Sequence, residues 1–217
     1  HMINHDIQGA DFICANTDSQ ALDRATGSTI LKLGDNVTRG LGAGADPKVA
    51  RAAAERDRAA IEELLAGADM IFITAGMGGG TGTGAAPVIA EIAKELGALT
   101  VAVVTKPFNF EGHKRKAAAE QGIAELVEEV DSLITIPNQK LMDILGKKTS
   151  MEEAFAKADD ILKGAVQGIS DIIMKPGYIN VDFADVKTVM SEKGIAMMGT
   201  GQSSADERGI DAASQAV

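Results

Sequence analysis

Short apolar runs alternate with stretches of helical periodicity along most of the 217-residue chain. The apolar runs predict strands at five places: residues 11–15, 29–33, 69–74, 99–105 and 132–136. Apolar positions three or four residues apart predict helices at four places: residues 47–66, 85–96, 114–130 and 151–175. The run TVAVVT at residues 100–105 is apolar on both strand faces, which is typical of a parallel sheet covered by helices on both sides. The alternation therefore predicts an α/β fold with a doubly wound parallel sheet.

Three of the predicted helix ends carry known end signals. Asp46 precedes Pro47, which places an N-cap residue before a proline at the first helical position. Gly97 follows the second predicted helix, and the sequence Lys-Pro-Gly at residues 175–177 is expected to end the long fourth helix.

The pattern changes after residue 177. A short helix is predicted to end near residue 193, an apolar run follows at residues 195–198, and residues 204–217 are predicted to form a helix. The last two elements have no following partner in the chain. We therefore expect three parts: residues 1–177 as the main domain, residues 178–193 as a loop and connecting helix, and residues 194–217 as the start of a second domain.

Composition narrows the class of protein. Lys and Arg number 21 against 31 Asp and Glu, a formal net charge of −10, which argues against nucleic-acid binding through a basic surface. Hydrophobic residues make up 45% of the chain, as expected of a globular domain. No apolar run reaches the roughly 18–20 residues that span a bilayer, so we expect no membrane insertion. The single cysteine, Cys14, is expected to be a small buried apolar side chain.

The richest candidate site is a glycine loop between a predicted strand and a predicted helix. Six glycines fall within residues 76–84, more than a tight turn requires, and backbone amides there can approach a ligand closely. The helix N-terminus that follows favours anions, so the loop predicts a bound di- or triphosphate. The loop residues expected at the phosphates are Gly78, Gly79, Gly80, Thr81, Gly82 and Thr83.

The identity of the phosphate ligand is open on local grounds. No Gly-Lys-Ser/Thr follows the glycines, so this is not a Walker loop. Gly80, Gly82 and Ala85 fit a relaxed dinucleotide fingerprint, although Lys106 ends the next strand where an NAD-binding acid is expected. A lysine there suits NADP, so an NADP-dependent oxidoreductase is an alternative interpretation.

Further segments carry a resemblance to a known family. The glycine segment GGGTGTG with its continuation AAP (residues 78–87) resembles the FtsZ family, the tubulin-like GTPases of bacterial cell division. Five other segments are similar to FtsZ segments in the same order: residues 16–18 (NTD), 40–47 (GLGAGADP), 106–112 (KPFNFEG), 136–138 (IPN) and 180–185 (NVDFAD). The resemblance covers essentially the whole chain, and it implies a tubulin/FtsZ-like GTPase domain that binds GTP or GDP.

The resemblance assigns roles near the phosphates. Gly42, Ala43 and Gly44 lie in a strand-to-helix connection, and the family places this loop at the γ-phosphate; a flexible connection is the simpler interpretation. Asn16 and Asp18 end a predicted strand at the usual ligand edge of such a sheet, and capping of the next helix is the alternative there.

The resemblance also assigns roles near the nucleoside. Glu111 and Arg115 lie four residues apart, which is typical of a surface ion pair, whereas matching FtsZ residues contact the nucleotide. Asn138 suits an N-cap, and the family reading puts it with Asp159 at the guanine edge. A carboxylate accepts from both N1–H and the 2-amino group of guanine, and adenine lacks that donor pair. Phe155 is a core candidate by itself and a base-stacking residue by resemblance.

The catalytic candidates are Asp182 and Asp185, three residues apart at the start of a short helix. Helix capping accounts for the spacing locally. By resemblance, the pair orients water for attack on a phosphoryl group held by the adjoining subunit, so hydrolysis accompanies head-to-tail self-assembly. Mg²⁺ is expected at the phosphates, held mainly by them and by water, because no tight protein cage is visible. The scattered histidines predict no transition-metal site.

The chain departs from the family at both ends. FtsZ opens with a strand, a glycine-rich loop and a helix, and residues 1–10 resemble only the end of that helix. We expect a fragment whose neighbouring strand lacks a partner, with division-ring partners bound through regions outside it. We expect cytoplasmic localisation at the septum. A truncated, non-catalytic module that caps intact filaments is the alternative to an active GTPase.

Overall fold

The computed structural model describes residues 10–25, 27–145, 149–175, 182–191, 194–196, 201 and 203–216. The expectations for residues 1–9, for the helix stop at 176–177 and for the apolar run beyond residue 196 lie outside the described residues. Within them, all five predicted strands and all four long helical segments form.

The centre of the fold is a four-stranded parallel sheet, in the order β3–β4–β5–β6. These strands span Met70–Gly76, Leu99–Lys106, Ser132–Pro137 and Gly194–Ala196. The first six residues of β4 are all buried, as the doubly apolar sequence predicts. Register places Gly76 opposite Thr105, and Ile136 opposite Thr105 on the other side, so β3, β4 and β5 end at one edge of the sheet.

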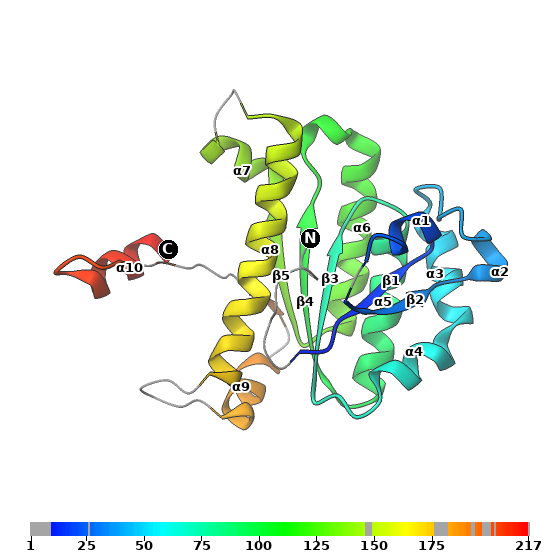
Figure 1. The fold of residues 1–217 in the computed structure, drawn as a ribbon, viewed down its shortest axis with the longest axis horizontal. Coiled ribbons are helices and arrows are strands. Elements are labelled where there is room, and N and C mark those ends of the chain that lie inside the picture. Colours follow the sequence, from blue (N-terminus) through cyan, green and yellow to red (C-terminus); the bar gives the residue numbers. More distant parts are fainter. Residues whose placement is uncertain are drawn as a thin grey trace.

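Helices cover both faces of this sheet (Figure 1). The face with α5 (Thr81–Glu95) and α6 (His113–Glu129) carries one apolar core. A second core joins the opposite face to α8 (Met151–Met174) and α9 (Phe183–Met190). The predicted doubly wound α/β fold is therefore confirmed.

A separate two-stranded parallel sheet lies on the side of the fold that carries α5 and the helix α3 (Pro47–Arg56) (Figure 1). It pairs β1 (Ile13–Asn16) with β2 (Thr29–Lys32), and the short helices α1 (Ser19–Leu22) and α2 (Asp35–Thr38) follow these strands. Among the described residues no strand joins β1 to β3. The expectation that a neighbouring strand lacks a partner agrees with this break.

One predicted helix is two. Residues 47–66 form α3 (Pro47–Arg56) and α4 (Arg58–Leu65), which meet at Asp57. The Asp57 carboxylate accepts a hydrogen bond of 2.5 Å from the Gly34 amide, and its backbone leaves the helical region (φ −97°, ψ 18°). The long-range contact to Gly34 therefore overrides the continuous helical pattern.

The other differences lie at element ends. Helix α5 begins at Thr81, four residues before its predicted start, because the Gly84 amide already bonds to the Gly80 carbonyl at 2.9 Å. Three short elements complete the description: the 3₁₀ turn η2 (Asn109–Glu111), α7 (Asn138–Leu145) and α10 (Arg208–Ala216). Since β6 adds to the same sheet as β5, the sheet continues past residue 194, and the domain division stays a prediction.

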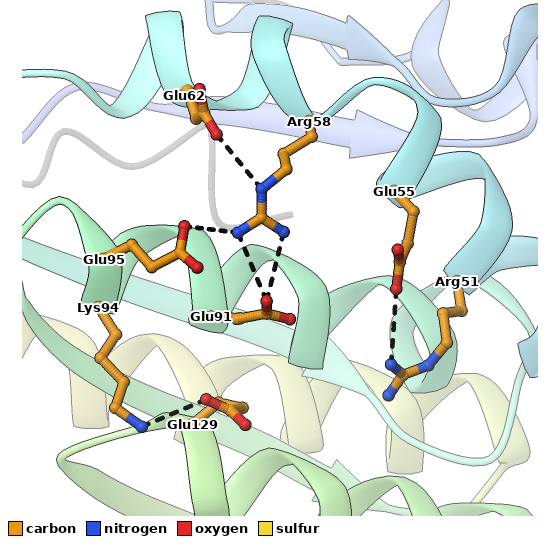
Figure 2. Close-up of polar contacts among 8 residues, drawn as sticks. All are labelled: Arg51, Glu55, Arg58, Glu62, Glu91, Lys94, Glu95 and Glu129. Carbon is orange, nitrogen blue, oxygen red and sulfur yellow. Dashed lines mark hydrogen bonds and ion pairs between the residues drawn. The ribbon is translucent and has the colours of Figure 1, made fainter.

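Ion pairs fasten the helices of the α5 face together (Figure 2). The Arg58 guanidinium contacts Glu95 at 2.5 Å, Glu62 at 3.3 Å and Glu91 at 3.4 Å, and the hydrogen bond with Glu95 raises the pKa of Arg58. Lys94 pairs with Glu129 at 3.2 Å. These contacts link α4 to α5, and α5 to α6. No helix within the described ranges is long and apolar enough to cross a bilayer.

Replacement of Gly84 by Ala is expected to destabilise the fold by about 3 kcal/mol. Helices α3 and α5 cross at Gly84, where an added Cβ would overlap the Pro47 carbonyl and lie 2.9 Å from the Arg51 amide nitrogen. Urea unfolding followed by circular dichroism measures the change. Gly164→Ala is the matched control, because a Cβ at this helical glycine meets no atom within 4 Å, and we expect a gain of about 0.5–1 kcal/mol. Equal behaviour of the two variants would contradict the close crossing.

Candidate functional site

A cavity of about 350 Å³ lies at the sheet edge where β3, β4 and β5 end. Its walls come from β3 and the glycine loop after it, from the end of β4 and the segment that follows, from the starts of α6 and α7, and from the first half of α8. The lining residues are Thr74, Ala75, Gly76, Met77, Gly79, Thr105, Pro107, Glu111, Arg115, Asn138, Phe155, Ala158, Asp159 and Leu162. This is the edge at which α/β sheets bind ligands.

Six of the residues expected from the sequence line this cavity together: Gly79, Glu111, Arg115, Asn138, Phe155 and Asp159. They come from five separate segments, so the fold brings together residues up to 80 positions apart in the chain. Their individual roles toward a ligand stay predictions.

The expected ion pair between Glu111 and Arg115 forms. One Glu111 oxygen lies 2.7 Å from the Arg115 guanidinium, and the other accepts from the Phe108 amide at 2.9 Å. The Glu111 carboxylate is mostly buried, whereas Arg115 is half exposed. Since each carboxylate oxygen has a second lone pair, the pair still leaves Glu111 able to accept from a ligand hydroxyl.

Asn138 begins α7, as predicted, and is only 4% exposed. Its side-chain oxygen lies buried without a hydrogen-bond partner within the described structure. A buried acceptor without a partner costs about 1–3 kcal/mol. Because the residue lines the cavity, a ligand donor placed there would remove that cost.

Asp159 is half buried in the wall contributed by α8, and this burial raises the pKa of its carboxyl. The neighbouring Asp160 carboxylate raises the pKa further, because like charges disfavour ionisation. The position therefore suits a carboxylate that gains a donor partner on ligand binding.

Phe155 combines the two interpretations offered by the sequence. Its ring packs edge-on against Phe108 at 5.1 Å and against Phe110 at 6.2 Å, and Phe108 stacks on Phe110 at 4.9 Å. The Phe155 side chain still lines the cavity and is 39% exposed. An apolar ring held on one side and open on the other can stack on a planar base.

The two threonines of the glycine loop differ in environment. Thr83 is buried, and its hydroxyl oxygen accepts from the Gly78 amide at 2.8 Å. Its oxygen therefore closes the loop, a structural role that the residue pattern does not reveal. Thr81 is half buried at the first position of α5, beside Gly80 and Gly82, and its hydroxyl donates to Asn16 at 3.3 Å.

The loop with Gly42, Ala43 and Gly44 lies against the glycine loop. A Cβ added at Gly80 would approach the Ala43 Cβ to 2.8 Å, so the two backbones are close. Gly42 and Gly44 have positive φ angles of 85° and 61°, and Ala45 also has a positive φ, of 61°. Strained non-glycine backbone of this kind is concentrated at functional sites.

Asn16 and Asp18 connect β1 to this region. The Asp18 carboxylate caps α1 by accepting from the Gln20 amide at 2.9 Å, so the capping interpretation is confirmed. The Asn16 side-chain oxygen accepts from the Asp18 amide at 3.2 Å as well as from Thr81. Sequence reasoning missed Thr17 between them, which is 0% exposed and contacts Thr81; its place inside the NTD motif was the available signal.

Asp182 and Asp185 lie away from the cavity. Asp182 caps α9 and accepts from the Asp185 amide at 2.9 Å, so the capping interpretation is confirmed here too. Helix α9 precedes β6, whose Gly194 pairs with Ser132 at the first residue of β5. Figure 1 shows α9 beside the C-terminal end of α8, at the foot of the sheet. The acidic pair and the cavity therefore occupy opposite edges of the sheet.

Binding of Mg²⁺ at this site stays a prediction. Within the described ranges no three His, Cys, Asp or Glu side chains gather to form a metal cage. Next to the glycine loop lie the Thr81 hydroxyl and the side-chain oxygen of Asn16, with Asp18 two residues further along the chain. Oxygen donors of this kind are the ligands that Mg²⁺ prefers in proteins.

The chain was compared with known proteins. A model of the tubulin/FtsZ family, GTPase domain, matches residues 2–146. The cell division protein FtsZ of Pseudomonas aeruginosa is 64% identical over all 217 residues, and that of Coxiella burnetii is 63% identical. The chain spans 55% and 56% of these two relatives, about half of their length.

Solved structures give the same fold. An empty FtsZ dimer from M. jannaschii superposes with a TM-score of 0.93 at 47% identity, covering 97% of this chain and 61% of that one. A GTPγS-bound protofilament of CetZ2 from Haloferax volcanii superposes with a TM-score of 0.78 at 24% identity, covering 90% of this chain and 58% of that one. The second likeness concerns the fold alone.

Proposed function

The chain belongs to the tubulin/FtsZ GTPase family, and from this premise we propose that it binds GTP in the cavity at the carboxyl ends of β3, β4 and β5. We propose further that GTP is hydrolysed where a second copy brings Asp182 and Asp185 to that cavity. The observation that carries the proposal is the convergence of six family-matching residues on one cavity of about 350 Å³. A nucleoside fits a space of this size when the phosphates extend outside it.

The base lies between α7 and α8 in this proposal. Ionised Asp159 accepts from guanine N1–H and the 2-amino group, and the buried Asn138 oxygen gains the donor that it lacks. Phe155 supplies the stacking face, because Phe108 and Phe110 hold its ring. Glu111 accepts from a ribose hydroxyl while Arg115 keeps the carboxylate in place.

The phosphates lie along the N-terminus of α5. Amides from Gly79 to Gly82 and the Thr81 hydroxyl donate to their oxygens, and the α5 dipole favours the negative charge. The loop with Gly42, Ala43 and Gly44 reaches the terminal phosphate, with Asn16 and Asp18 on the β1 side. Magnesium, when bound, neutralises charge on the phosphate oxygens.

Hydrolysis needs a water molecule directed at the γ-phosphorus, so that the bond to the β–γ bridging oxygen breaks. Asp182 and Asp185 accept the proton of that water in this proposal. The two edges of the sheet are separated by the length of the strands, so one chain does not bring its own acids to its own cavity. Contact between unlike edges repeats indefinitely and generates a filament.

The relatives' names support a role in cell division, and we propose a cytoplasmic filament at the division septum. The M. jannaschii FtsZ structure is a dimer, which supports the proposal of self-association. The guanine reading replaces the NADP alternative, because the family is a GTPase family and Lys106 does not line the cavity.

Equilibrium binding of a fluorescent GTP to the 217-residue chain tests the proposal. With magnesium present, unlabelled GTP and GDP are expected to displace the probe, whereas ATP and NADPH at the same concentration leave it bound. Displacement by NADPH would restore the oxidoreductase interpretation. Absence of GTP binding by a folded chain would favour the alternative of a non-catalytic capping module, which addition of the chain to filaments of an intact relative then tests.

A further inference from the structure

Thr17 contacts both loops that are proposed to bind the phosphates. Its side chain contacts Thr81 of the glycine loop, and its backbone contacts Gly42 of the other loop. Its side chain is 0% exposed, between the end of β1 and the start of α5. The hydroxyl oxygens of Thr17 and Thr81 lie 2.7 Å apart, although 64 positions separate the residues in the chain. A buried hydroxyl pair of this kind fixes the rotamer of each partner.

The backbone of Thr17 holds the other loop. Its carbonyl oxygen accepts from the Gly42 amide at 3.0 Å and from the Thr38 hydroxyl at 3.1 Å. The Thr38 hydroxyl in turn accepts from the Gly40 amide at 3.3 Å. The Thr17 carbonyl is therefore one of the groups that hold the segment before Ala43 and Gly44, together with the Ser19 amide, which donates to the Gly40 carbonyl at 3.0 Å.

The proton of the Thr81 hydroxyl depends on this arrangement. A hydroxyl donates one hydrogen bond and accepts others. When Thr17 donates to Thr81, the Thr81 proton is left for Asn16, which lies 3.3 Å away in this structure, or for an oxygen of an incoming ligand. With an apolar residue at position 17, Thr81 loses the donor that sets this direction.

We propose that Thr17 is a positioning residue for polyphosphate binding: it aims the Thr81 hydroxyl and holds the Gly42 loop in register with it. Its side chain acts through Thr81 and does not touch the ligand, whereas its contact with the Gly42 amide is made by the backbone carbonyl, which a substitution keeps. The inference rests on the proposed function, since Thr17 lies behind the residues that are proposed to contact the phosphates.

The test measures dissociation constants for GTP and GDP, with magnesium, on four forms of the 217-residue chain. Thr17→Val keeps the shape and removes the hydroxyl, and Thr17→Ser restores it. Thr100→Val is the matched control, because Thr100 is equally buried but donates to the Ala98 carbonyl at the start of β4. We expect Thr17→Val to bind GTP about tenfold more weakly, and Thr17→Ser and Thr100→Val to stay within about twofold.

A double-mutant cycle separates positioning from general stability. The Thr17 side chain acts through Thr81. In a protein that already carries Thr81→Val, Thr17→Val is therefore expected to lower GTP affinity by less than about twofold. Two results together support the proposal: Thr17→Ser binds GTP as well as the unaltered chain, and Thr17→Val no longer lowers GTP affinity once Thr81→Val is present. Unchanged GTP affinity in Thr17→Val, equal losses in Thr100→Val, or losses that multiply in the cycle overturn it.

The same measurements distinguish the two levels of the account. If the unaltered chain binds GTP and Thr17→Val binds it equally well, only the positioning role fails. If the unaltered chain, folded by circular dichroism, binds no GTP, the proposed function fails and the positioning role falls with it.

Discussion

Replacement of Asp185 by Asn is expected to lower GTP hydrolysis about 100-fold while GTP affinity stays within twofold. Helix α9, which carries Asp185, lies at the amino edge of the sheet, opposite the cavity, so we expect this charge not to contribute to binding within one chain. Asp182→Asn is expected to behave alike, because asparagine still caps α9 and only the charge is lost. Phosphate release and GTP binding are measured on the same preparations.

The control for this prediction is Asp171→Asn. Asp171 lies in the last turns of α8 and pairs with Lys175 at 2.8 Å, so it samples charge removal near the same edge without touching the acidic pair. We expect its hydrolysis rate to stay within twofold. A tenfold fall in Asp171→Asn would mean that general charge at this edge, and not the pair, controls the reaction.

Mixing two weak variants tests the shared site directly. Asp185→Asn retains an intact cavity, and Asp159→Asn retains an intact acidic pair. The GTP concentration is chosen so that it saturates the cavity of Asp185→Asn but not that of Asp159→Asn. With equal amounts of the two variants, half of the cavities and half of the acidic pairs are intact, so about a quarter of head-to-tail contacts join an intact cavity to an intact pair. We therefore expect about a quarter of the unaltered rate to return. Activity no greater than the sum of the separate variants would contradict a site shared between copies.

The second large effect concerns the base. Asp159→Asn is expected to weaken GTP binding about 100-fold, because two hydrogen bonds from guanine to a charged acceptor are lost or weakened at about 1.5 kcal/mol each. Binding of xanthosine triphosphate is expected to improve, since the amide nitrogen donates to the 2-oxo group while the amide oxygen still accepts from N1–H. Asp160→Asn is the matched control, since this adjacent α8 acid is exposed and does not line the cavity.

The same residue predicts a pH dependence. Burial raises the pKa of Asp159 above the ordinary value of 3.8, so the folded chain holds this proton at a higher pH than an exposed aspartate does. The protonated acid cannot accept from both guanine donors. GTP affinity is therefore expected to be highest above the raised pKa and to fall as the pH drops through it. Asp159→Asn is expected to show no such fall. A fall of equal size in both proteins would assign the titration to another group.

The sequence contained most of the fold because the sheet is buried on both faces. The run at residues 100–105 identified β4 without ambiguity, and its neighbours followed the same pattern. The division of residues 47–66 at Asp57 was not predictable, because its cause is a contact with Gly34, 23 positions away. The start of α5 at Thr81 was not predictable either, because the glycines around it have a low helix propensity.

The residues of the candidate site could be predicted from the sequence, but their contacts with one another could not. Motif resemblance selected the six cavity residues, yet nothing local showed that Phe155 packs against Phe108 and Phe110. The two threonines of the glycine motif, two positions apart, also look equivalent in the sequence, although Thr83 closes the loop and Thr81 faces Thr17. Such distinctions depend on side-chain direction in the folded chain, which a linear pattern does not contain.

The most direct test of the central claim is hydrogen exchange of the chain with and without GTP and magnesium, read residue by residue. We expect slower exchange at the amides of residues 40–46 and 78–83 with GTP, and no change with ATP at the same concentration. Slower exchange at these amides with GTP alone places the guanine nucleotide in the cavity at the ends of β3, β4 and β5. Saturating GTP that leaves both loops unchanged, or equal protection by ATP, would contradict it.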